Sequence, residues 1–316
     1  MKKPCVSIFR ILLLTAHLFL IVLTGSHIAQ AQPGAVDPAF NGGAVLTNGA
    51  VNVFKRQIDG KILVGGSFEG FNGRAQNSVA RLNADGTVDA TFNPPNIVGT
   101  IRAIEIQPDG KILIGGSFVI PLLTNNTFVA RLNADGSFDN SFVAPTLFTA
   151  DPNNAAYDLA IAADGKIYVA GSFFYQIPNT PSATRSKFAR FNSDGTLDTT
   201  FAPVGTFTDI YDIEIQPDGK VVGVMTDGGS NARFIKRFNA DGTEDFSFNA
   251  LVTGASGTVR VNALKIQTDG KILIAGAFNL VNNTARVGAA RLNANGTLDT
   301  AFNVTSNGTL NEVEIE

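Results

Sequence analysis

The chain has 316 residues, of which 44% are hydrophobic and 16% charged, so it can bury a sizeable globular core. Its 32 glycines and 13 prolines indicate many turns, and its 24 phenylalanines supply the large apolar surface because tryptophan is absent. A net charge of −3 without any basic cluster argues against nucleic acid or an anionic lipid surface as a partner.

Residues 1–31 have the parts of a secretory signal peptide. Two lysines and an arginine give a positive start, the stretch 11–23 is mostly apolar, and residues 29–31 read Ala-Gln-Ala, a small-x-small cleavage pattern. The apolar stretch is shorter than the ~20 residues that cross a bilayer, which disfavours a membrane anchor. We expect a mature chain that starts at Gln32, has no membrane span, and is secreted, periplasmic or at the cell surface.

Loss of this segment limits the chemistry of the mature chain. Cys5, His17 and His27 all lie within it, so the mature chain has neither cysteine nor histidine. We therefore expect no disulfide, catalytic triad, thiol nucleophile or zinc site, and no cofactor. Phosphate-binding and dinucleotide fingerprints are also missing. Removing three basic residues leaves 21 against 27 acidic ones, a net charge of −6.

An internal repeat dominates residues 51–302. The string D-G-K recurs at spacings of 50 to 55 residues, ending at Lys61, Lys111, Lys166, Lys220 and Lys271. In four copies it precedes a run such as I-L-I-G-G-S-F (112–118), whereas the fourth copy reads V-V-G-V-M-T-D (221–227). A second block, R-L-N-A-D-G-T-V-D-A-T-F in its first copy, begins at Arg81, Arg131, Arg190, Arg237 and Arg291.

Each repeat divides into four short strands joined by turns. In the second repeat these are 101–107, 111–118, 128–133 and 137–142, and the Asp-Gly pairs between them suit tight hairpins. Four antiparallel strands at a period near 50 are typical of a β-propeller blade. We predict an all-β propeller of four-stranded antiparallel blades in a single domain, 32–316. Repeats 1 to 5 span about 51–92, 101–142, 156–201, 210–248 and 261–302.

Both ends of the propeller sequence lie within a further repeat. Residues 36–40 match the end of a fourth strand, and residues 310–315 match a first strand. A blade built from these two segments lacks its second and third strands. The ring therefore either closes imperfectly or belongs to a longer chain cut short after Glu316. We expect the longer chain, and otherwise a monomer.

The two repeated blocks together resemble the delta-60 repeat family of bacterial secreted and surface proteins. The resemblance covers nearly all of residues 37–316. It implies a β-propeller whose biochemical role is not established, and it brings no catalytic residues to this chain.

Antiparallel connections place the repeated Asp-Gly turns at one end of each blade and the dissimilar loops at the other. The dissimilar loops include residues 69–78, 144–156 and 174–187. Since binding residues concentrate on loops that a rigid scaffold positions, we expect an unknown extracellular ligand, a glycan or a protein, on this variable face.

The second residue of each first strand is the candidate ligand contact. In the five repeats it is Asn52, Arg102, Tyr157, Tyr211 and Asn262, all able to hydrogen-bond. Three positions further on, Lys55 and Glu105 should pair, as should Glu214 and Lys265. The less specific alternative is a solvated channel lined by weak ion pairs.

The repeated Asn83, Asp85 and Asp89 pattern allows two interpretations. Oxygen ligands at such spacings could hold Ca²⁺, but the fuller alternating ligand set and the terminal bidentate glutamate are absent. An Asp-Gly hairpin, in which short polar side chains cap the backbone, explains the same residues. We expect the hairpin and no metal.

Two functions follow from these observations. The first is an exported, non-catalytic binding or scaffolding module. The second is a carboxylate-dependent polysaccharide hydrolase or lyase with Asp158 and Asp212, beside the two tyrosines, as candidate catalytic groups. A purely structural spacer is a third possibility.

Overall fold

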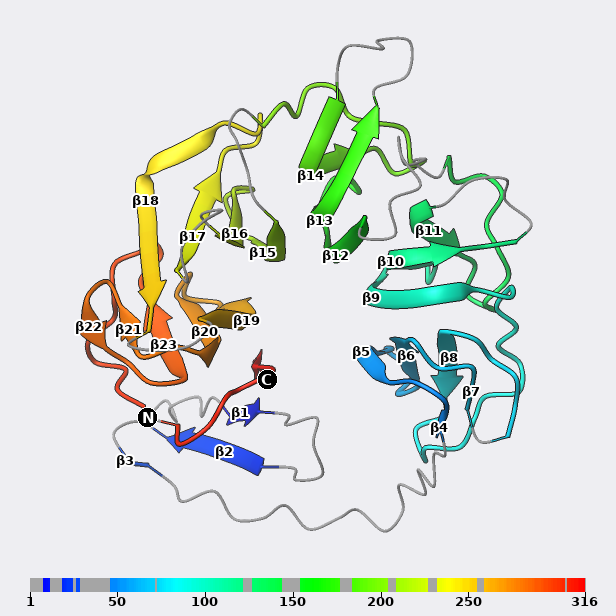
Figure 1. The fold of residues 1–316 in the computed structure, drawn as a ribbon, viewed down its shortest axis with the longest axis horizontal. Coiled ribbons are helices and arrows are strands. Elements are labelled where there is room, and N and C mark those ends of the chain that lie inside the picture. The colour runs from blue at the N-terminus through cyan, green and yellow to red at the C-terminus, as the bar shows by residue number, and fades with distance from the viewer. Residues whose placement is uncertain are drawn as a thin grey trace, which may run out of the picture. The chain divides into compact units, whose positions relative to one another are not determined.

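The computed structural model describes residues 8–11, 19–24, 27–28, 46–71, 73–121, 127–143, 154–176, 184–203, 209–226, 232–254, 259–304 and 306–315. These residues form β-strands and no helix, as predicted (Figure 1). Within this part of the chain, no helix long and apolar enough to cross a membrane occurs. The chain forms two compact units, which are described separately.

The first unit comprises residues 37–205 and 209–211 and holds repeats 1 to 3. Each repeat forms a three-stranded antiparallel sheet whose middle strand is the run after D-G-K. The sheets are β5 (Val51–Arg56), β6 (Ile62–Gly66) and β8 (Val79–Leu82); β9 (Val98–Ile106), β10 (Ile112–Val119) and β11 (Thr127–Leu132); and β12 (Ala155–Ile161), β13 (Ile167–Gln176) and β14 (Thr184–Phe191). A small ladder joins β4 (Leu46–Thr47) to β7 (Gly70–Phe71).

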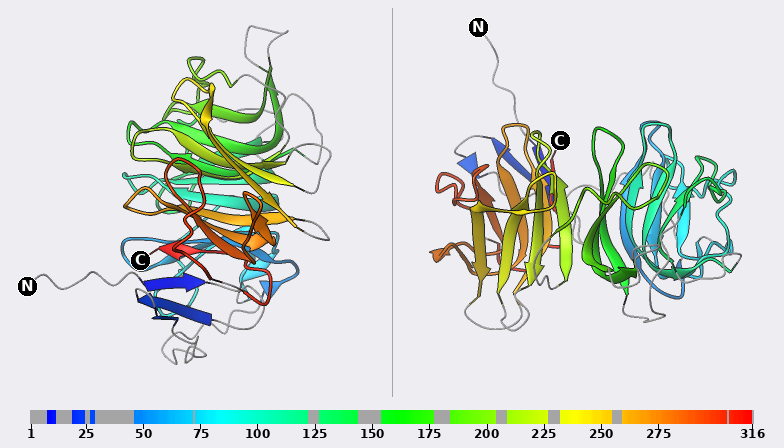
Figure 2. Two further views of the ribbon diagram at one scale, coloured as in Figure 1. Left: turned by 90° about the vertical axis from the view of Figure 1, so that its left-hand side faces the viewer. Right: turned by 90° about the horizontal axis from the view of Figure 1, so that it is seen from above.

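The second unit comprises residues 1–36, 206–208 and 212–316 and holds repeats 4 and 5. Repeat 4 contains β15 (Ile210–Ile215), β16 (Val221–Thr226), β17 (Arg233–Phe238) and β18 (Glu244–Thr253). Repeat 5 contains β19 (Arg260–Ile266), β20 (Ile272–Ala277) and β23 (Ala289–Leu292). Between β20 and β23 it extends a hairpin, β21 (Leu280–Val281) and β22 (Thr284–Ala285), onto β18. Figure 2 shows the strands ending in hairpin turns.

The structure describes only one of the two partial strands predicted at the ends of the propeller sequence. Residues 36–40 lie outside the described residues. Residues 310–315 yield only β24 (Glu314–Ile315), which pairs with β1 (Ile8–Ile11); β1 pairs in turn with β2 (Phe19–Thr24), and β2 with β3 (His27–Ile28). The strands β1 to β3 fall within the predicted signal peptide.

The fourth strand of most repeats is shorter than the sequence predicts. In repeats 1, 2, 3 and 5 it is a single bridge, such as Leu82 with Val88, followed by a turn; only repeat 4 forms a long strand, β18. The turn in repeat 1 is fixed by Asp89, whose carboxylate accepts hydrogen bonds from the backbone and hydroxyl of Thr91. Asp245 caps Ser247 in the same way in repeat 4, so the cap fixes the local turn but does not by itself set the length of the fourth strand.

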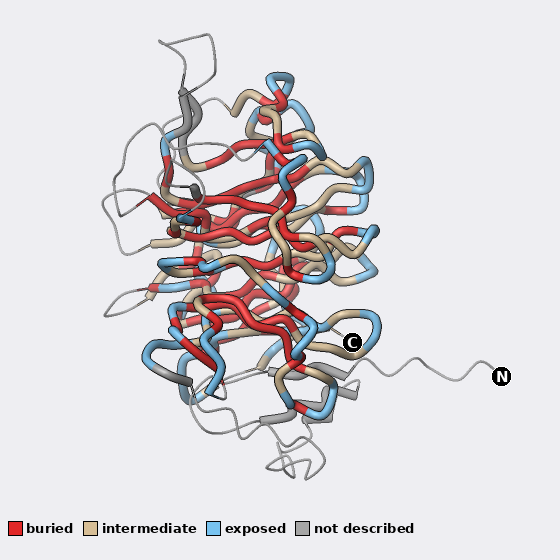
Figure 3. The backbone as a smooth tube through the Cα atoms, turned by 90° about the vertical axis from the view of Figure 1, so that its right-hand side faces the viewer, coloured by how far each residue is buried: buried red, intermediate tan, exposed pale blue. Residues whose placement is uncertain are grey.

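The middle strands are buried on both faces, so neighbouring sheets of a unit share cores. On β10, Ile112 and Ile114 belong to a cluster that contains Phe92 of repeat 1, whereas Leu113 packs with Phe173 of repeat 3. Figure 3 shows buried residues running along the strands, with exposed residues concentrated at the turns. A single repeat therefore cannot bury its own apolar surface, as in other repeat architectures.

A charged group recurs in all five repeats, and in repeats 1, 2 and 4 it also binds the repeat that follows. In repeat 1 the Asp89 carboxylate accepts hydrogen bonds from Lys61 Nζ and Arg81 Nε, both at 2.7 Å. The guanidinium of Arg81 lies 4.7 Å from the centre of the Phe92 ring, and its Nη1 donates to the backbone carbonyl of Ala134 in repeat 2 at 2.6 Å. We call this Lys–Arg–Asp–Phe group the inter-repeat tie.

The tie recurs with the same chemistry. Arg131 donates to the carbonyl of Ser193 in repeat 3, and Arg237 donates to that of Ala294 in repeat 5. The arginine–aspartate pairs of the other repeats are Arg131–Asp139, Arg190–Asp198, Arg237–Asp245 and Arg291–Asp299. The two halves of the repeat signature thus meet at one carboxylate.

The phenylalanine ring of one repeat packs against the glycine of the second Asp-Gly turn in the next repeat. Gly136 has a φ of +92°, and a Cβ there would lie 2.9 Å from the Phe92 ring. The backbone amide of Asn93 donates to the carbonyl of Asp135 in the same turn. Only glycine meets both the backbone conformation and the close approach.

Hydrogen bonding keeps the shared carboxylates ionised. Burial by itself would raise the pKa of Asp139, but the bonds from Ser141, Lys111 and Arg131 outweigh it and hold this pKa well below its usual range. The folded state thus binds fewer protons than the unfolded chain in acid. The stabilisation is complete above the ordinary aspartate pKa and is lost as the pH falls below it.

The substitution Asp139→Asn should lower the free energy of unfolding by about 3 kcal/mol, because it leaves the buried Arg131 without its counter-charge. Urea unfolding followed by circular dichroism measures this change. Asp109→Asn is the control, since Asp109 caps an exposed turn through its own Oδ1 only. Equal effects of the two substitutions would contradict the tie.

Candidate functional site

Four of the five candidate ligand contacts lie at β-bulges. Ile101 pairs with Gly116 and Ala103 pairs with Gly115, so Arg102 has no partner on the neighbouring strand. The same register shift occurs at Asn52, Tyr157 and Asn262. A bulge bends its strand and redirects one side chain, which is why bulges are common next to binding sites.

The glycine at the end of the run after D-G-K makes room for the bulge. A Cβ on Gly116 would lie 2.1 Å from the carbonyl oxygen of Thr100, the residue that precedes the bulge by two. Gly66, Gly171 and Gly276 face an equivalent carbonyl at 1.9 to 2.1 Å. In repeat 4 the corresponding residue is Met225. The recurrence of this glycine is therefore explained by the space that the bulge requires, and it gives no evidence of a ligand.

Two of the five candidates use their side chains to hold the neighbouring strand. The Asn52 amide donates to the carbonyl of Ile101 at 3.1 Å, and the Asn262 amide donates to that of Leu310 at 2.8 Å. The first contact links β5 to β9, and the second links β19 to the segment before β24. These asparagines are thus accounted for by packing.

The other three candidates come together, as the alignment of first strands predicts. The rings of Tyr157 and Tyr211 stack with centroids 5.3 Å apart and planes 11° from parallel. The guanidinium of Arg102 lies 5.5 Å from the centre of the Tyr157 ring. Arg102 is exposed, Tyr211 is 38% exposed, and Tyr157 is half-buried.

Residues that the sequence analysis did not single out complete this group. Lys187 forms an ion pair with Asp209 at 2.9 Å and donates to the hydroxyl of Ser172, which also bonds the Tyr157 side chain. Residues 174–187 were predicted as a loop of the variable face, but β13 runs to Gln176 and β14 starts at Thr184, so Lys187 lies in a strand. Nothing in its spacing pointed to Tyr157. We call Arg102, Tyr157, Ser172, Lys187, Asp209 and Tyr211 the Tyr157 cluster.

The Tyr157 cluster favours a neutral phenol. Burial raises the pKa of Tyr157, and the charge of Asp209 and the neighbouring Tyr211 raise it further, against the opposing effect of Arg102. Tyr157 therefore keeps its proton at neutral pH and can act as a hydrogen-bond donor. The cluster offers a cation, stacked aromatic rings and hydroxyl groups on one surface of the first unit.

The predicted charge pairs are confirmed. Lys55 pairs with Glu105 at 2.6 Å in the first unit, and Lys265 pairs with Glu214 in the second. Their side chains are 24 to 40% exposed, so solvent screening leaves each pair little effect on stability.

The candidate catalytic carboxylates have less distinctive surroundings. Asp212 Oδ2 accepts a hydrogen bond from the backbone amide of Leu264 at 2.6 Å, which is a strand-to-strand contact. Asp158 lies half-buried in β12. Near Asp212, burial raises the pKa of Glu312 to about 7, helped by the charges of Asp212 and Glu314 and opposed by Lys265.

The Asn83–Asp85–Asp89 pattern forms the predicted hairpin. Asp85 Oδ1 accepts hydrogen bonds from the backbone and hydroxyl of Thr87, and the Asn83 amide donates to the same hydroxyl. Asp89 belongs to the inter-repeat tie instead. Within the described ranges, the acidic residues form no group of three placed to hold a metal ion.

A family defined by sequence matches this chain five times. The family is described as a β-propeller domain of unknown function, DUF5122, and its matches cover residues 57–92, 107–142, 162–201, 216–248 and 267–302. The chain belongs to this family. Each match starts at or near the first Asp-Gly turn and ends at the phenylalanine that packs on the following repeat, or at its counterpart. No curated protein matches the sequence.

Several solved structures are similar to the chain. Hydrazine synthase from Kuenenia stuttgartiensis is 14% identical over 84% of this chain and 72% of its own, with a TM-score of 0.49. A gluconolactonase from Xanthomonas campestris is 16% identical over 88% and 91%, with a TM-score of 0.43. PorZ, a type-IX secretion component of Porphyromonas gingivalis, is 14% identical over 90% and 38%, with a TM-score of 0.47. None of these similarities bears on activity.

The substitution Gly116→Ala should lower the free energy of unfolding by about 3 kcal/mol, because the added methyl group would collide with the Thr100 carbonyl unless the bulge is lost. Urea unfolding measures the change. Gly308→Ala is the matched control, since a Cβ there meets nothing within 4 Å. If the alanine at 116 were as well tolerated as the one at 308, the explanation of the glycine would be wrong.

Proposed function

We propose that this protein is an exported, non-catalytic β-propeller that binds an extracellular ligand through the Tyr157 cluster. One observation carries the proposal: Arg102, Tyr157 and Tyr211, all residues of the first unit, stack on one another. Guanidinium groups and partly exposed tyrosines are the side chains that contribute most to recognition surfaces.

The distribution of repeated and variable residues supports this function. The lysine, arginine, aspartate and phenylalanine of the signature bind one another and the following repeat, so their recurrence reflects stability. The bulge residue differs between repeats and stands outside the ladder pairing. Ligand contact is therefore proposed at the positions that the architecture leaves unconstrained.

A second candidate function is carboxylate-dependent hydrolysis or lysis of a polysaccharide, and one observation favours it. Burial raises the pKa of Glu312 to about 7, and the charge of the Asp212 carboxylate contributes to this rise. Such a pair can supply a proton donor and an ionised partner. Release of reducing ends from soluble polysaccharides, lost in Glu312→Gln, would favour this candidate over the first.

Export rests on residues 1–31. Removal of this segment would take β1, β2 and β3 from the mature protein. N-terminal sequencing of the protein recovered outside the cytoplasm tests the proposal, with Gln32 as the expected first residue.

The binding function is tested by a thermal-shift screen against peptidoglycan fragments and a glycan panel, followed by calorimetry on each ligand found. The double variant Arg102→Ala/Tyr211→Ala should bind at least tenfold more weakly, because it removes the cation and one of the stacked rings. Ile58→Ser, at a fully exposed turn residue of repeat 1, is the control. Undiminished affinity of the double variant for every ligand found would refute the assignment, as would a screen without any ligand.

A further inference from the structure

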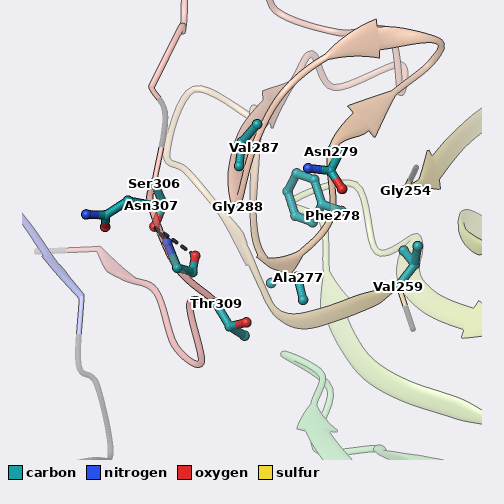
Figure 4. A pocket seen from close by; sticks show the side chains of 12 residues that line it. Gly254, Val259, Ala277, Phe278, Asn279, Val287, Gly288, Ser306, Asn307 and Thr309 are labelled. Carbon is teal, nitrogen blue, oxygen red and sulfur yellow. Dashed lines mark hydrogen bonds between the residues drawn. The ribbon is translucent and has the colours of Figure 1, made fainter. Parts of the chain in front are cut away.

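A pocket of about 380 Å³ lies in the second unit, at the end of repeat 5 opposite to its Asp-Gly turns. One wall is the segment 276–279 that leaves β20, together with Val287 and Gly288 before β23; the other wall is the segment 306–309 before β24. Figure 4 shows Phe278, Asn279 and Val287 on one side and the turn from Ser306 to Thr309 on the other. None of the residues that line this pocket belongs to the Tyr157 cluster.

Backbone hydrogen bonds fix both walls of this pocket. The amide of Gly276 donates to the carbonyl of Gly288, and the amide of Ser306 donates to that of Val287. The amide of Leu310 closes the other end by donating to the carbonyl of Gly276. The hydroxyl of Ser306 bonds the Gly308 carbonyl at 2.8 Å, which sets the turn. The pocket is thus preformed, as most small-molecule sites are.

None of the described residues that line the pocket is charged. Its polar side chains are Asn279, Ser306, Asn307 and Thr309, and the remaining lining residues are glycine, alanine, valine and phenylalanine. Asn279, Asn307 and Thr309 are exposed, and their side chains make no hydrogen bond to other described residues. The two side-chain amides and the hydroxyl group can therefore donate hydrogen bonds to a ligand and accept them from it.

A ligand without charge suits this lining, because none of the described lining residues supplies a counter-charge. A side-chain amide both donates and accepts hydrogen bonds, so it can pair with two adjacent hydroxyl groups of a sugar. The glycines of the lining allow a sugar ring to approach the backbone closely. The volume is near the lower end of the ~300–1,000 Å³ of small-molecule sites, which suits one or two sugar rings. We propose that this pocket binds a neutral saccharide.

The proposal is independent of the Tyr157 cluster, and its test separates the two. Isothermal titration calorimetry of the purified protein uses cellobiose, maltose, lactose and diacetylchitobiose, with galacturonic acid as the charged comparison. At least one neutral disaccharide should bind, and galacturonic acid should bind at least tenfold more weakly. Arg102→Ala/Tyr211→Ala should leave the binding of that disaccharide unchanged.

Gly308→Leu should weaken binding, because Gly308 lines the pocket and a Cβ there meets nothing within 4 Å, which leaves room for a leucine side chain beside the ligand. Asn279→Ala should weaken binding at least tenfold without filling the pocket. Asn303→Ala, at an exposed asparagine outside the lining, is the matched control, and melting temperatures report the folding of each variant. The proposal is overturned if no neutral sugar binds, or if the sugar that binds does so equally well to the Asn279 and Asn303 variants.

Discussion

In every repeat one aspartate carboxylate accepts hydrogen bonds or an ion pair from a lysine of the first turn and an arginine of the third strand. Asp139 does so with Lys111 and Arg131, and its second oxygen caps the turn at Ser141. Because Arg131 also reaches a carbonyl of the next repeat, one buried charge sets the turn within its own repeat and the spacing to its neighbour. The shared apolar cores form between sheets held in this way.

This constraint separates the residues that must recur from those that are free to vary. The tie uses the lysine, arginine, aspartate and phenylalanine, and the bulge uses a glycine in four repeats, so these residues carry little information about a ligand. The bulge residue stands outside both requirements. In two repeats it is an asparagine that binds the adjacent backbone. At Arg102 and Tyr157 it instead forms a stacked surface with Tyr211, the residue at the aligned position of repeat 4. A stable frame with variable bulges is what a binding scaffold needs.

Much of the fold could be predicted from the sequence, since the period and the Asp-Gly turns specify strands and hairpins locally. The fourth strand was predicted too long in four repeats. Asp89 caps a turn at Thr91, but Asp245 makes the same cap within the long strand β18, so residue types alone do not decide between turn and strand. The alignment of first strands brought Arg102, Tyr157 and Tyr211 together correctly. It could not find the partners Lys187, in β14, and Asp209, just before β15, because the repeat has other residue types at these positions, nor show that Asn52 and Asn262 bind backbone carbonyls.

The most direct test of the inter-repeat tie is amide hydrogen exchange in the variant Arg131→Leu. This change removes the donor to Ser193 while Asp139 keeps its bond from Lys111. The account predicts that the turn at residues 192–197 in repeat 3 loses protection at least tenfold, together with residues 127–143 of repeat 2. Faster exchange confined to repeat 2, with the turn of repeat 3 unchanged, would contradict it.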